Sequence, residues 1–381
     1  MGDFVIYLDN GATTWPKPPS VLKEINRCFR YYAANPGRGG HDMAVRCGEA
    51  VYNCRSNVGE LFGVNNPEKI IFTSNATHAL NVAIKGSVRA AGHVIITSME
   101  HNSVLRPVCA LGVNYDIAQS DIHGYVNPKT VEGLIRSNTC LIVCTMASNV
   151  CGSLQPFEKI AQIARKHKIL FLLDASQGAG AVDINMSESG IDMLAAPGHK
   201  GLYGPSGTGV LCLNTDFELK TLTEGGTGSR SKEPVQPPEL PDRLESGTLN
   251  FVGIAGLNAG VEFVKKVGIK EIGFHESRLA KMLAEDLSVI KGIKLAGYSA
   301  DRPRIGVVSV FSEDKDCVEI SSKLNSEYKI ATRAGYHCSY IAHKSIGTGD
   351  CGTVRFSLGV FNTADDVKKA AGAVSRIMRG Y

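Results

Sequence analysis

Short apolar runs alternate with helical patterns over the first two thirds of the chain. Five of these runs are mainly apolar and end in polar or turn residues: 69–74, 93–98, 139–147, 167–174 and 191–197. Continuous apolar runs of this length are typical of strands that are buried on both faces of a parallel sheet. Helical patterns, such as the one over 76–86, lie between the runs. We therefore expect an α/β fold with a mostly parallel sheet covered by helices on both faces.

The pattern changes beyond about residue 260, where the predicted helices and strands become shorter. There we predict helices over 277–290 and 317–328, strands over 294–298, 304–312 and 354–358, and a last helix opened by Thr363 with Asp366 near the capping-box position. A chain of 381 residues is also long for a single core. We therefore predict a large domain over 15–260 and a small α+β domain formed by 1–14 and 261–381. The Gly- and Pro-rich stretch 223–241 is expected to be a mobile loop.

Composition narrows the classes of function. The net charge is only +4 and no basic block stands out, so nucleic acid is not an expected partner. The N-terminus has no basic segment followed by an apolar one, and the apolar runs are too short to cross a membrane. We expect a soluble cytoplasmic protein without a membrane partner.

The chain has eleven cysteines, but none of them form a C-x-x-C pair. A structural metal site is therefore not expected, and free thiols in a reducing compartment are the default. Cys140, Cys144 and Cys212 lie in apolar runs, where a cysteine acts as a small buried hydrophobic residue.

Lys200 and Asp174 suggest a cofactor. Lys200 follows an apolar run and is flanked by glycines, surroundings that would lower its pKa. Asp174 is the last residue of another buried run, at the carboxyl end of a predicted strand, where open α/β sheets bind ligands. Pyridoxal phosphate needs a lysine to bind its aldehyde and an acid to keep its ring nitrogen protonated. Taken singly, an exposed loop lysine and a helix-capping aspartate remain alternatives.

Other polar residues follow predicted strands on the same side of the sheet. The turn 75–78 is a helix N-terminus directly after a strand, where a phosphate is favoured, although capping alone also explains it. His101 and Asn149 each follow a strand. His101 could instead be a surface or core histidine, and Asn149 could simply form a turn. Arg38 and His41 lie in the loop 34–41, which by composition could equally be a solvated turn.

Cys338 and Arg355 are candidates for a nucleophile and a carboxylate ligand. Cys338 follows a glycine turn between two predicted strands, and a nearby cation such as Arg333 would favour its thiolate. Arg355 starts a strand, and its planar guanidinium matches a carboxylate. The alternatives are that Cys338 is a surface cysteine without a function and that Arg355 forms a structural ion pair.

Several of these segments together resemble a known family. They are YLDNGATT (7–14), TSNATHALN (73–81), MEHNS (99–103), 167–180, 194–211, LESGTLN (244–250), RAGYHC (333–338) and VRFSLGVFNT (354–363). In this order they resemble the cysteine desulfurases, class V aminotransferase relatives among the fold-type I pyridoxal phosphate enzymes. The resemblance covers nearly the whole chain. It implies a pyridoxal 5'-phosphate-dependent transferase fold with a seven-stranded large domain.

The resemblance also implies roles for individual residues. Catalytic roles fall to Lys200, Cys338 and His101. Cofactor binding falls to Lys200, Asp174, Gln177, His101, Ala76, Thr77, His199 and Asn149, with Thr248 reaching the phosphate of a second subunit in a homodimer. Substrate binding falls to Arg355, Asn149, Gly11, Ala12, Arg333 and Arg38.

The implied reaction converts L-cysteine to L-alanine. Lys200 would take the α-proton, and the Cys338 thiolate would attack the substrate sulfur to form a persulfide for a protein acceptor. A selenocysteine lyase that acts on L-selenocysteine is the nearest alternative. An aminotransferase or epimerase, or a non-catalytic assembly scaffold, fits the residues less well.

The chain departs from the family pattern at three places. Pro197 stands where many relatives have serine, which puts one phosphate contact in doubt, and SYIAHK follows Cys338 in place of a small residue or proline. The short segment from Cys338 to Arg355 resembles the group with a compact, ordered loop. It contains a second thiol, Cys351, which is either a surface residue or able to exchange a persulfide.

Overall fold

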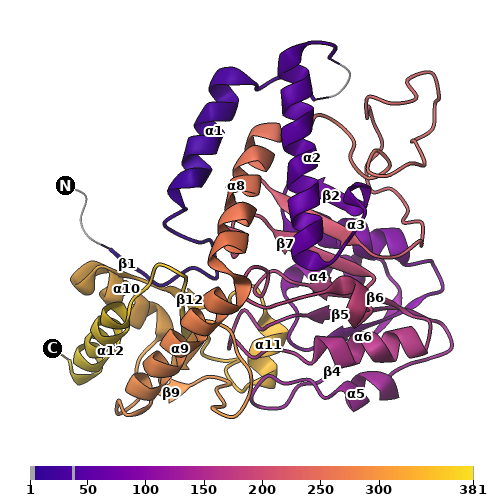
Figure 1. The fold of residues 1–381 in the computed structure, drawn as a ribbon. Coiled ribbons are helices and arrows are strands. Elements are labelled where there is room, and N and C mark those ends of the chain that lie inside the picture. Colours follow the sequence, from indigo (N-terminus) through magenta and orange to yellow (C-terminus); the bar gives the residue numbers. More distant parts are fainter. Residues whose placement is uncertain (1–4, 37–38, 381) are drawn as a thin grey trace.

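A seven-stranded sheet forms the centre of the larger part of the molecule (Figure 1). The structure is a computed structural model and describes residues 5–36 and 39–380. The strand order is β2-β8-β7-β6-β5-β3-β4. The bounds are β2 Ile70–Thr73, β3 His93–Thr97, β4 Asn114–Ala118, β5 Thr139–Thr145, β6 Leu170–Asp174, β7 Met193–Pro197 and β8 Gly209–Leu213. Neighbouring strands are parallel except at β8, which is antiparallel to both β2 and β7. The predicted mostly parallel sheet is confirmed.

Helices cover both faces of this sheet because its strands are apolar on both sides. On one face, α2 (Asp42–Phe62), α6 (Phe157–Lys166) and α8 (Phe251–Val267) pack in one core with residues such as Ile95 and Phe171. On the other face, α3 (Ala76–Ser87) and α4 (Asn102–Ala110) pack with the neighbouring residues Val94 and Leu172. Successive strand residues thus enter different cores, as the alternation of side chains in a strand requires.

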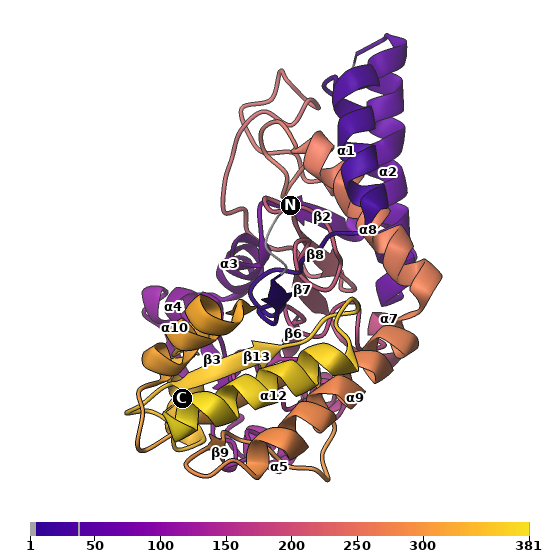
Figure 2. The same ribbon diagram turned by 90° about the vertical axis from the view of Figure 1, so that its left-hand side faces the viewer.

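The smaller part has an antiparallel sheet of its own, in the order β12-β13-β10-β9. Its strands are β9 Lys294–Leu295, β10 Val307–Phe311, β12 Arg333–Gly335 and β13 Thr353–Ser357. Figure 2 shows α12 (Ala364–Arg379) lying along β13 beside α9 (Ile269–Ser288), and α10 (Cys317–Tyr328) completes the same core. The predicted capping box at Thr363 and Asp366 is confirmed.

The N-terminal segment belongs to both parts of the molecule. β1 (Ile6–Tyr7) pairs in parallel with β11 (Ile330–Ala331), and the chain then crosses to the large sheet. There α1 (Pro19–Tyr31) and α2 pack along α8 and extend beyond the sheet (Figure 2). The proposed boundary at residue 260 falls inside α8. The domain limits therefore stay predictions.

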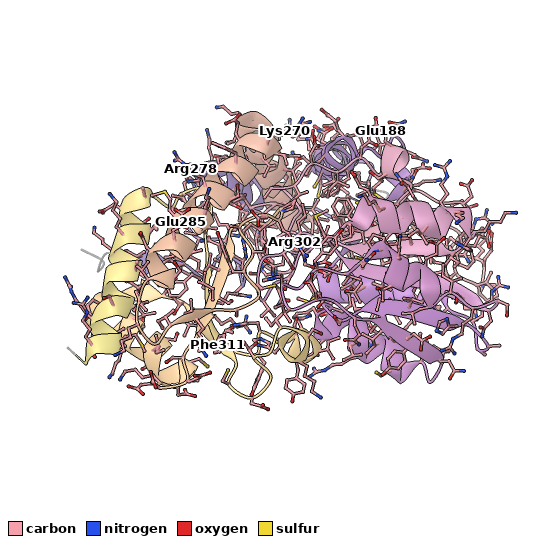
Figure 3. The ribbon with its side chains drawn as sticks, turned by 90° about the horizontal axis from the view of Figure 1, so that it is seen from below. Glu188, Lys270, Arg278, Glu285, Arg302 and Phe311 are labelled. Atoms are coloured by element: carbon pink, nitrogen blue, oxygen red, sulfur yellow. The ribbon has the colours of Figure 1, made fainter. Side chains whose placement is uncertain are left out.

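The two parts meet through backbone hydrogen bonds, an ion pair and a small apolar cluster. The Leu154 N–H donates to the Pro303 carbonyl at 3.1 Å, and the Ile305 N–H donates to the Gly152 carbonyl at 2.9 Å. Arg302, which lies between the two parts in Figure 3, forms an ion pair with Asp121. Direct backbone contacts of this kind fix the two sheets relative to each other.

Several elements were absent from the sequence predictions, among them β4, β8, α4, α8, α5 (Pro128–Gly133) and α11 (Tyr340–Ser345). The remaining short helices are α7 (Met186–Ser189) and a 3-10 turn at Pro67–Lys69. The predicted loop 223–241 contains no helix or strand. Among the described helices, none combines the length and apolar character that a membrane span requires.

Candidate active site

A pocket of about 220 Å³ lies at the carboxyl ends of the central strands of the large sheet. In register, Thr145 at the end of β5 lies opposite Asp174 at the end of β6, and Asp174 lies opposite Ala195 of β7. Loops that leave neighbouring parallel strands converge at this edge. The strand order therefore brings segments that are far apart in the sequence round one cavity.

Most of the candidate site residues line this pocket. They are Gly11, Ala12, Ala76, Thr77, His101, Asn149, Asp174, Gln177, His199, Lys200, Arg333 and Arg355. Two candidates among the described residues do not line it. Cys338 is exposed beside it, and Thr248 lines a separate pocket together with His78. Arg38 lies outside the described residues.

Lys200 lies in the turn after β7 and is partly buried. Burial, followed by the charge of Arg355, lowers its pKa to about 8, while the carboxylate of Asp174 acts in the opposite direction. A lysine with a lowered pKa has more neutral, nucleophilic amine at neutral pH than a surface lysine. The expected fall in the pKa of Lys200 is confirmed.

The turn that carries Lys200 packs against the loop after β6 at two glycines. A Cβ at Gly201 would lie 2.1 Å from the carbonyl oxygen of Ala179, and a Cβ at Gly180 would lie 2.0 Å from that of Gly201. Gly180 also has a φ of +87°, which favours glycine. Because these two loops follow β6 and β7, this contact sets the spacing between Asp174 and Lys200.

The N-terminal segment holds the same turn from another side. The carbonyl oxygen of His199 accepts hydrogen bonds from the Thr14 N–H at 3.1 Å and from the Lys17 ammonium at 2.6 Å. The Thr14 hydroxyl donates to the carbonyl of Lys200 at 3.0 Å. Burial lowers the pKa of Lys17 to about 8. Sequence reasoning missed Lys17, because TTWPKPP indicates only an extended turn.

One oxygen of Asp174 is held and the other faces the pocket. Asp174 Oδ1 accepts hydrogen bonds from the backbone N–H of Ser176, at 3.0 Å, and from its hydroxyl. Within the part of the chain that the structure describes, no donor lies within hydrogen-bond distance of Oδ2. Oδ2 is therefore available to a protonated ring nitrogen.

A second buried carboxyl group, Glu100, supports this edge of the sheet. Its Oε1 accepts hydrogen bonds from the Thr97 hydroxyl at 2.6 Å and from the Thr145 N–H at 2.8 Å. Burial is the main cause that raises the pKa of Glu100 to about 8; the hydrogen bond from Thr97 opposes it, and the nearby Asp174 carboxylate acts with it. Glu100 thus keeps its proton at neutral pH, where it joins the turn before His101 to β5. Sequence reasoning missed Glu100, because no local pattern indicates a buried, protonated carboxyl group.

The opposite end of the pocket suits an anion. Asn75 caps α3 by accepting a hydrogen bond from the His78 N–H at 2.8 Å, and Ala76 and Thr77 line the pocket in the first turn. The first N–H groups of a helix lack partners within the helix and favour negative charge. His199 also lines the pocket, and its Nδ1 is buried without a hydrogen-bond partner among the described residues.

His101 combines a cap with a position in the pocket. It is the N-cap of α4, and its Nδ1 accepts a hydrogen bond from the Ser103 N–H at 3.0 Å. Burial is the main cause that lowers the pKa of His101, while the carboxylate of Asp174 opposes it. The ring is therefore a neutral imidazole at neutral pH, and its proton lies on Nε2 because Nδ1 accepts a hydrogen bond.

Two arginines line the other side of the pocket. Arg333 and Arg355 are cross-strand partners on β12 and β13. Arg355 forms an ion pair with Asp9, with Nη2 2.8 Å from Oδ1, and its Nη1 donates to the carbonyl of Asn149 at 3.0 Å. The structural ion pair and the pocket position, which we treated as alternatives, are both present in the structure. Asp9 was not singled out from the sequence, although it lies in the YLDNGATT segment.

Cys338 is exposed, between the buried side chains of His337 and Ser339. The residues from 336 to 339 form a turn that leads directly into α11, so the expected loop between two strands contains a helix. The carbonyl of Cys338 accepts a hydrogen bond from the Asn102 N–H at 2.8 Å, which places this backbone beside His101. The thiol is thus reachable from solvent next to the pocket.

Comparison with known proteins gives the family. The family model described as aminotransferase class-V matches residues 6–370. The chain belongs to the class V aminotransferase family. Within this family it is similar to a protein of Methanothermobacter thermautotrophicus named a probable cysteine desulfurase, with 31% identity over 372 residues, 95% of this chain and 92% of that protein.

Two further relatives support this placement in the class V aminotransferase family. A protein of Halalkalibacterium halodurans, also named a probable cysteine desulfurase, is 30% identical and covers 97% of this chain and 92% of its own length. The apo structure of a cysteine desulfurase from Thermococcus onnurineus NA1 has a TM-score of 0.91 at 28% identity, covering 99% of this chain and 95% of that one.

The pocket of this class V aminotransferase fits pyridoxal phosphate. It combines a lysine with a lowered pKa, a carboxylate oxygen without a donor, a helix N-terminus and the unpartnered His199 Nδ1. These groups match the aldehyde, the ring nitrogen and the phosphate of the cofactor. Pro197, the last residue of β7, offers no hydroxyl at the phosphate end.

The second thiol of the segment 338–355, Cys351, lies in a different setting from Cys338. Burial raises the pKa of the Cys351 thiol, which disfavours its thiolate, and the Cys317 thiol donates to the Cys351 carbonyl at 3.3 Å. Over residues 5–36 and 39–380, no cluster of three or more His, Cys, Asp or Glu side chains could hold a metal ion.

Proposed function

We propose that this chain is a pyridoxal 5'-phosphate-dependent cysteine desulfurase, which converts L-cysteine to L-alanine and carries the sulfur as a persulfide on Cys338. The observation that carries the proposal is the exposed Cys338 thiol beside a pocket that contains Lys200 and Asp174. The similarity to proteins named cysteine desulfurases supports the same function.

The cofactor would lie between the end of β6 and the N-terminus of α3. Lys200 would bind its aldehyde, Asp174 its ring nitrogen, and His101 would lie against its ring, with Gln177 and Asn149 beside it. Gln177 donates a hydrogen bond to the Gly11 carbonyl at 3.1 Å, which joins the N-terminal segment to this side of the pocket. When bound, the cofactor supplies a protonated ring that withdraws electrons from the substrate.

The phosphate would be held by Ala76, Thr77 and His199. We also propose a homodimer, in which Thr248 of each subunit contacts the phosphate of the other. The position of Thr248 outside the pocket of its own chain supports this arrangement. A mixture of Lys200→Ala and Thr248→Ala variants would then form some dimers with one intact site.

The substrate carboxylate would bind Arg355, with Arg333, Asn149 and the backbone at Gly11 and Ala12 around it. We propose that Arg38 also binds the substrate. Lys200 would take the α-proton. The Cys338 thiolate would attack the substrate sulfur, so that a sulfur–sulfur bond forms as the carbon–sulfur bond breaks and its electron pair stays with the alanine fragment. His101 would carry protons between the thiols and that fragment.

The persulfide would pass to a protein acceptor in a reducing, cytoplasmic compartment. All eleven cysteines are unpaired, which supports a reducing environment. The selenocysteine lyase alternative differs in one respect, because selenium leaves more readily and would not need attack by Cys338.

The decisive experiment measures alanine formation from L-cysteine and from L-selenocysteine, with wild type and Cys338→Ala. We expect the variant to keep the visible absorption of the bound cofactor and to lose alanine formation from cysteine. If the variant turns over cysteine at the wild-type rate, the proposal fails. If selenocysteine is strongly preferred and the variant still releases selenium, the enzyme is a selenocysteine lyase.

A further inference from the structure

We propose that Ser339 is a positioning residue that fixes the Cys338 thiol through the side-chain amide of Asn149. The Ser339 hydroxyl donates to Asn149 Oδ1 at 2.8 Å, and Asn149 Nδ2 donates to the His337 carbonyl at 2.7 Å. A single amide thus holds both neighbours of the nucleophile. We refer to Ser339, Asn149 and His337 as the amide clamp. The inference rests on the proposed function of Cys338.

The backbone at Cys338 needs such a clamp. His337 and Cys338 have φ values of 49° and 58°, so two successive residues with side chains lie in the left-handed region. This conformation is costly for residues other than glycine and persists only where surrounding contacts hold it. His337 is held further by a 2.9 Å hydrogen bond between its Nε2 and Thr353 Oγ1. The result is an exposed thiol between two buried side chains, 4% exposed at His337 and 0% at Ser339.

The Ser339 hydroxyl does not have the role that its position in the chain would suggest. Ser339 is the N-cap of α11, where a serine normally accepts a hydrogen bond from a backbone N–H of the first turn. Its side chain makes no such capping bond. The hydroxyl donates to Asn149 in the large part of the molecule, at a sequence separation of 190 residues. Its contribution is therefore to the position of the Cys338 turn and not to the end of the helix.

The amide clamp also joins the nucleophile to the carboxylate end of the pocket. The carbonyl of Asn149 accepts a hydrogen bond from Arg355 Nη1 at 3.0 Å, and both residues line the pocket. The guanidinium proposed to bind the substrate and the turn that presents the thiol are therefore held by one residue. Precise placement of the attacking atom relative to the bound substrate accelerates the transfer step.

The test compares Ser339→Ala with Ser345→Ala. Ser345 lies at the other end of α11, where its hydroxyl bonds only to the Ile341 carbonyl within the helix, so its removal is the matched control. In Ser339→Ala we expect persulfide formation on Cys338 in a single turnover to slow by about three- to tenfold, the effect of one lost hydrogen bond. The KM for cysteine and the cofactor absorption should stay at wild-type values.

Hydrogen exchange gives a readout that needs no activity. Amides over 337–343 should exchange faster in Ser339→Ala than in wild type or in Ser345→Ala. Wild-type exchange together with wild-type persulfide formation in Ser339→Ala would overturn the proposal, as would a parallel loss of cofactor binding. If wild type makes no alanine from cysteine but the exchange rates still change as expected, the clamp stands and the proposed function fails.

Discussion

The turns that carry Lys200 and Cys338 place their reactive side chains in opposite environments, one partly buried and one exposed to solvent. Lys200 is partly buried, and burial lowers its pKa to about 8. Cys338 is exposed to solvent. An amine that reacts with an aldehyde must be neutral, which desolvation favours, whereas a thiol that passes sulfur to another protein must be reachable.

Both turns are nevertheless fixed in the same way, through backbone groups next to the reactive residue. The Lys200 turn is held at the His199 carbonyl by Thr14 and Lys17. The Cys338 turn is held at the His337 carbonyl by Asn149. Bonds to the neighbouring backbone fix the direction of a side chain while they leave its reactive atom free.

The largest expected effect is the loss of the Lys200 amine. Lys200→Ala should lower alanine formation from cysteine by at least about a thousandfold, because it removes both the covalent attachment and the proposed base. Lys266→Ala on the exposed side of α8 should keep wild-type turnover and is the control. Residual activity within tenfold of wild type in Lys200→Ala would contradict the role of the buried turn.

The second prediction concerns the glycine contact behind Lys200. Gly201→Ala should lower the free energy of unfolding by about 2–3 kcal/mol, because the new Cβ meets backbone that cannot move without displacing the loop after β6. Gly372→Ala in α12, where a Cβ meets no atom within 4 Å, should raise the stability by about 0.5–1 kcal/mol. Denaturant unfolding of both variants measures the contrast, and equal values would exclude a tight contact.

The third prediction tests the lowered pKa of Lys200. The neutral fraction of an amine rises about tenfold per pH unit below its pKa and levels off above it. The rate at which the apoenzyme captures added pyridoxal phosphate should therefore rise with pH up to about pH 8 and stay constant above it. Its rate is measured by the change in visible absorption, with a free lysine derivative as the control. A rate that still rises near pH 10 would show that burial leaves the pKa unchanged.

The smallest effect is expected at Cys338 itself. Cys338→Ala should change the free energy of unfolding by less than about 0.5 kcal/mol, because the exposed thiol contributes little packing and alanine keeps the same backbone. Thermal unfolding of this variant beside Gly201→Ala compares the two turns directly. A loss as large as that of Gly201→Ala would mean that the thiol is part of the structural support.

Much of the fold could be predicted from local patterns. Apolar runs predicted β2, β3, β5, β6 and β7, because strands buried on both faces need continuous apolar sequence. β4 was missed because its sequence, NYDIA, has an exposed first residue and only one buried residue. α11 was missed because six residues are too few for a helical period to stand out.

The candidate site was predicted where a residue type indicates its own chemistry. Lysine, aspartate and histidine at or after strand ends, and arginine on a strand, suggested the pocket, and most of them line it. The supporting residues were missed. Lys17, Glu100 and Ser339 act through partners distant in the sequence or through burial, and no local pattern carries that information.

The sequence by itself predicted most strands of the large sheet and the reactive groups near their ends, since both depend on residue type and local periodicity. The tertiary structure decided which of those groups meet and in what state they are held. Asn149 and Ser339 come together only when the two sheets dock, and the pKa of Lys200 falls only when neighbouring loops exclude water. Hydrogen bonding and desolvation depend on distances between segments, which are set by packing and not by the chain order.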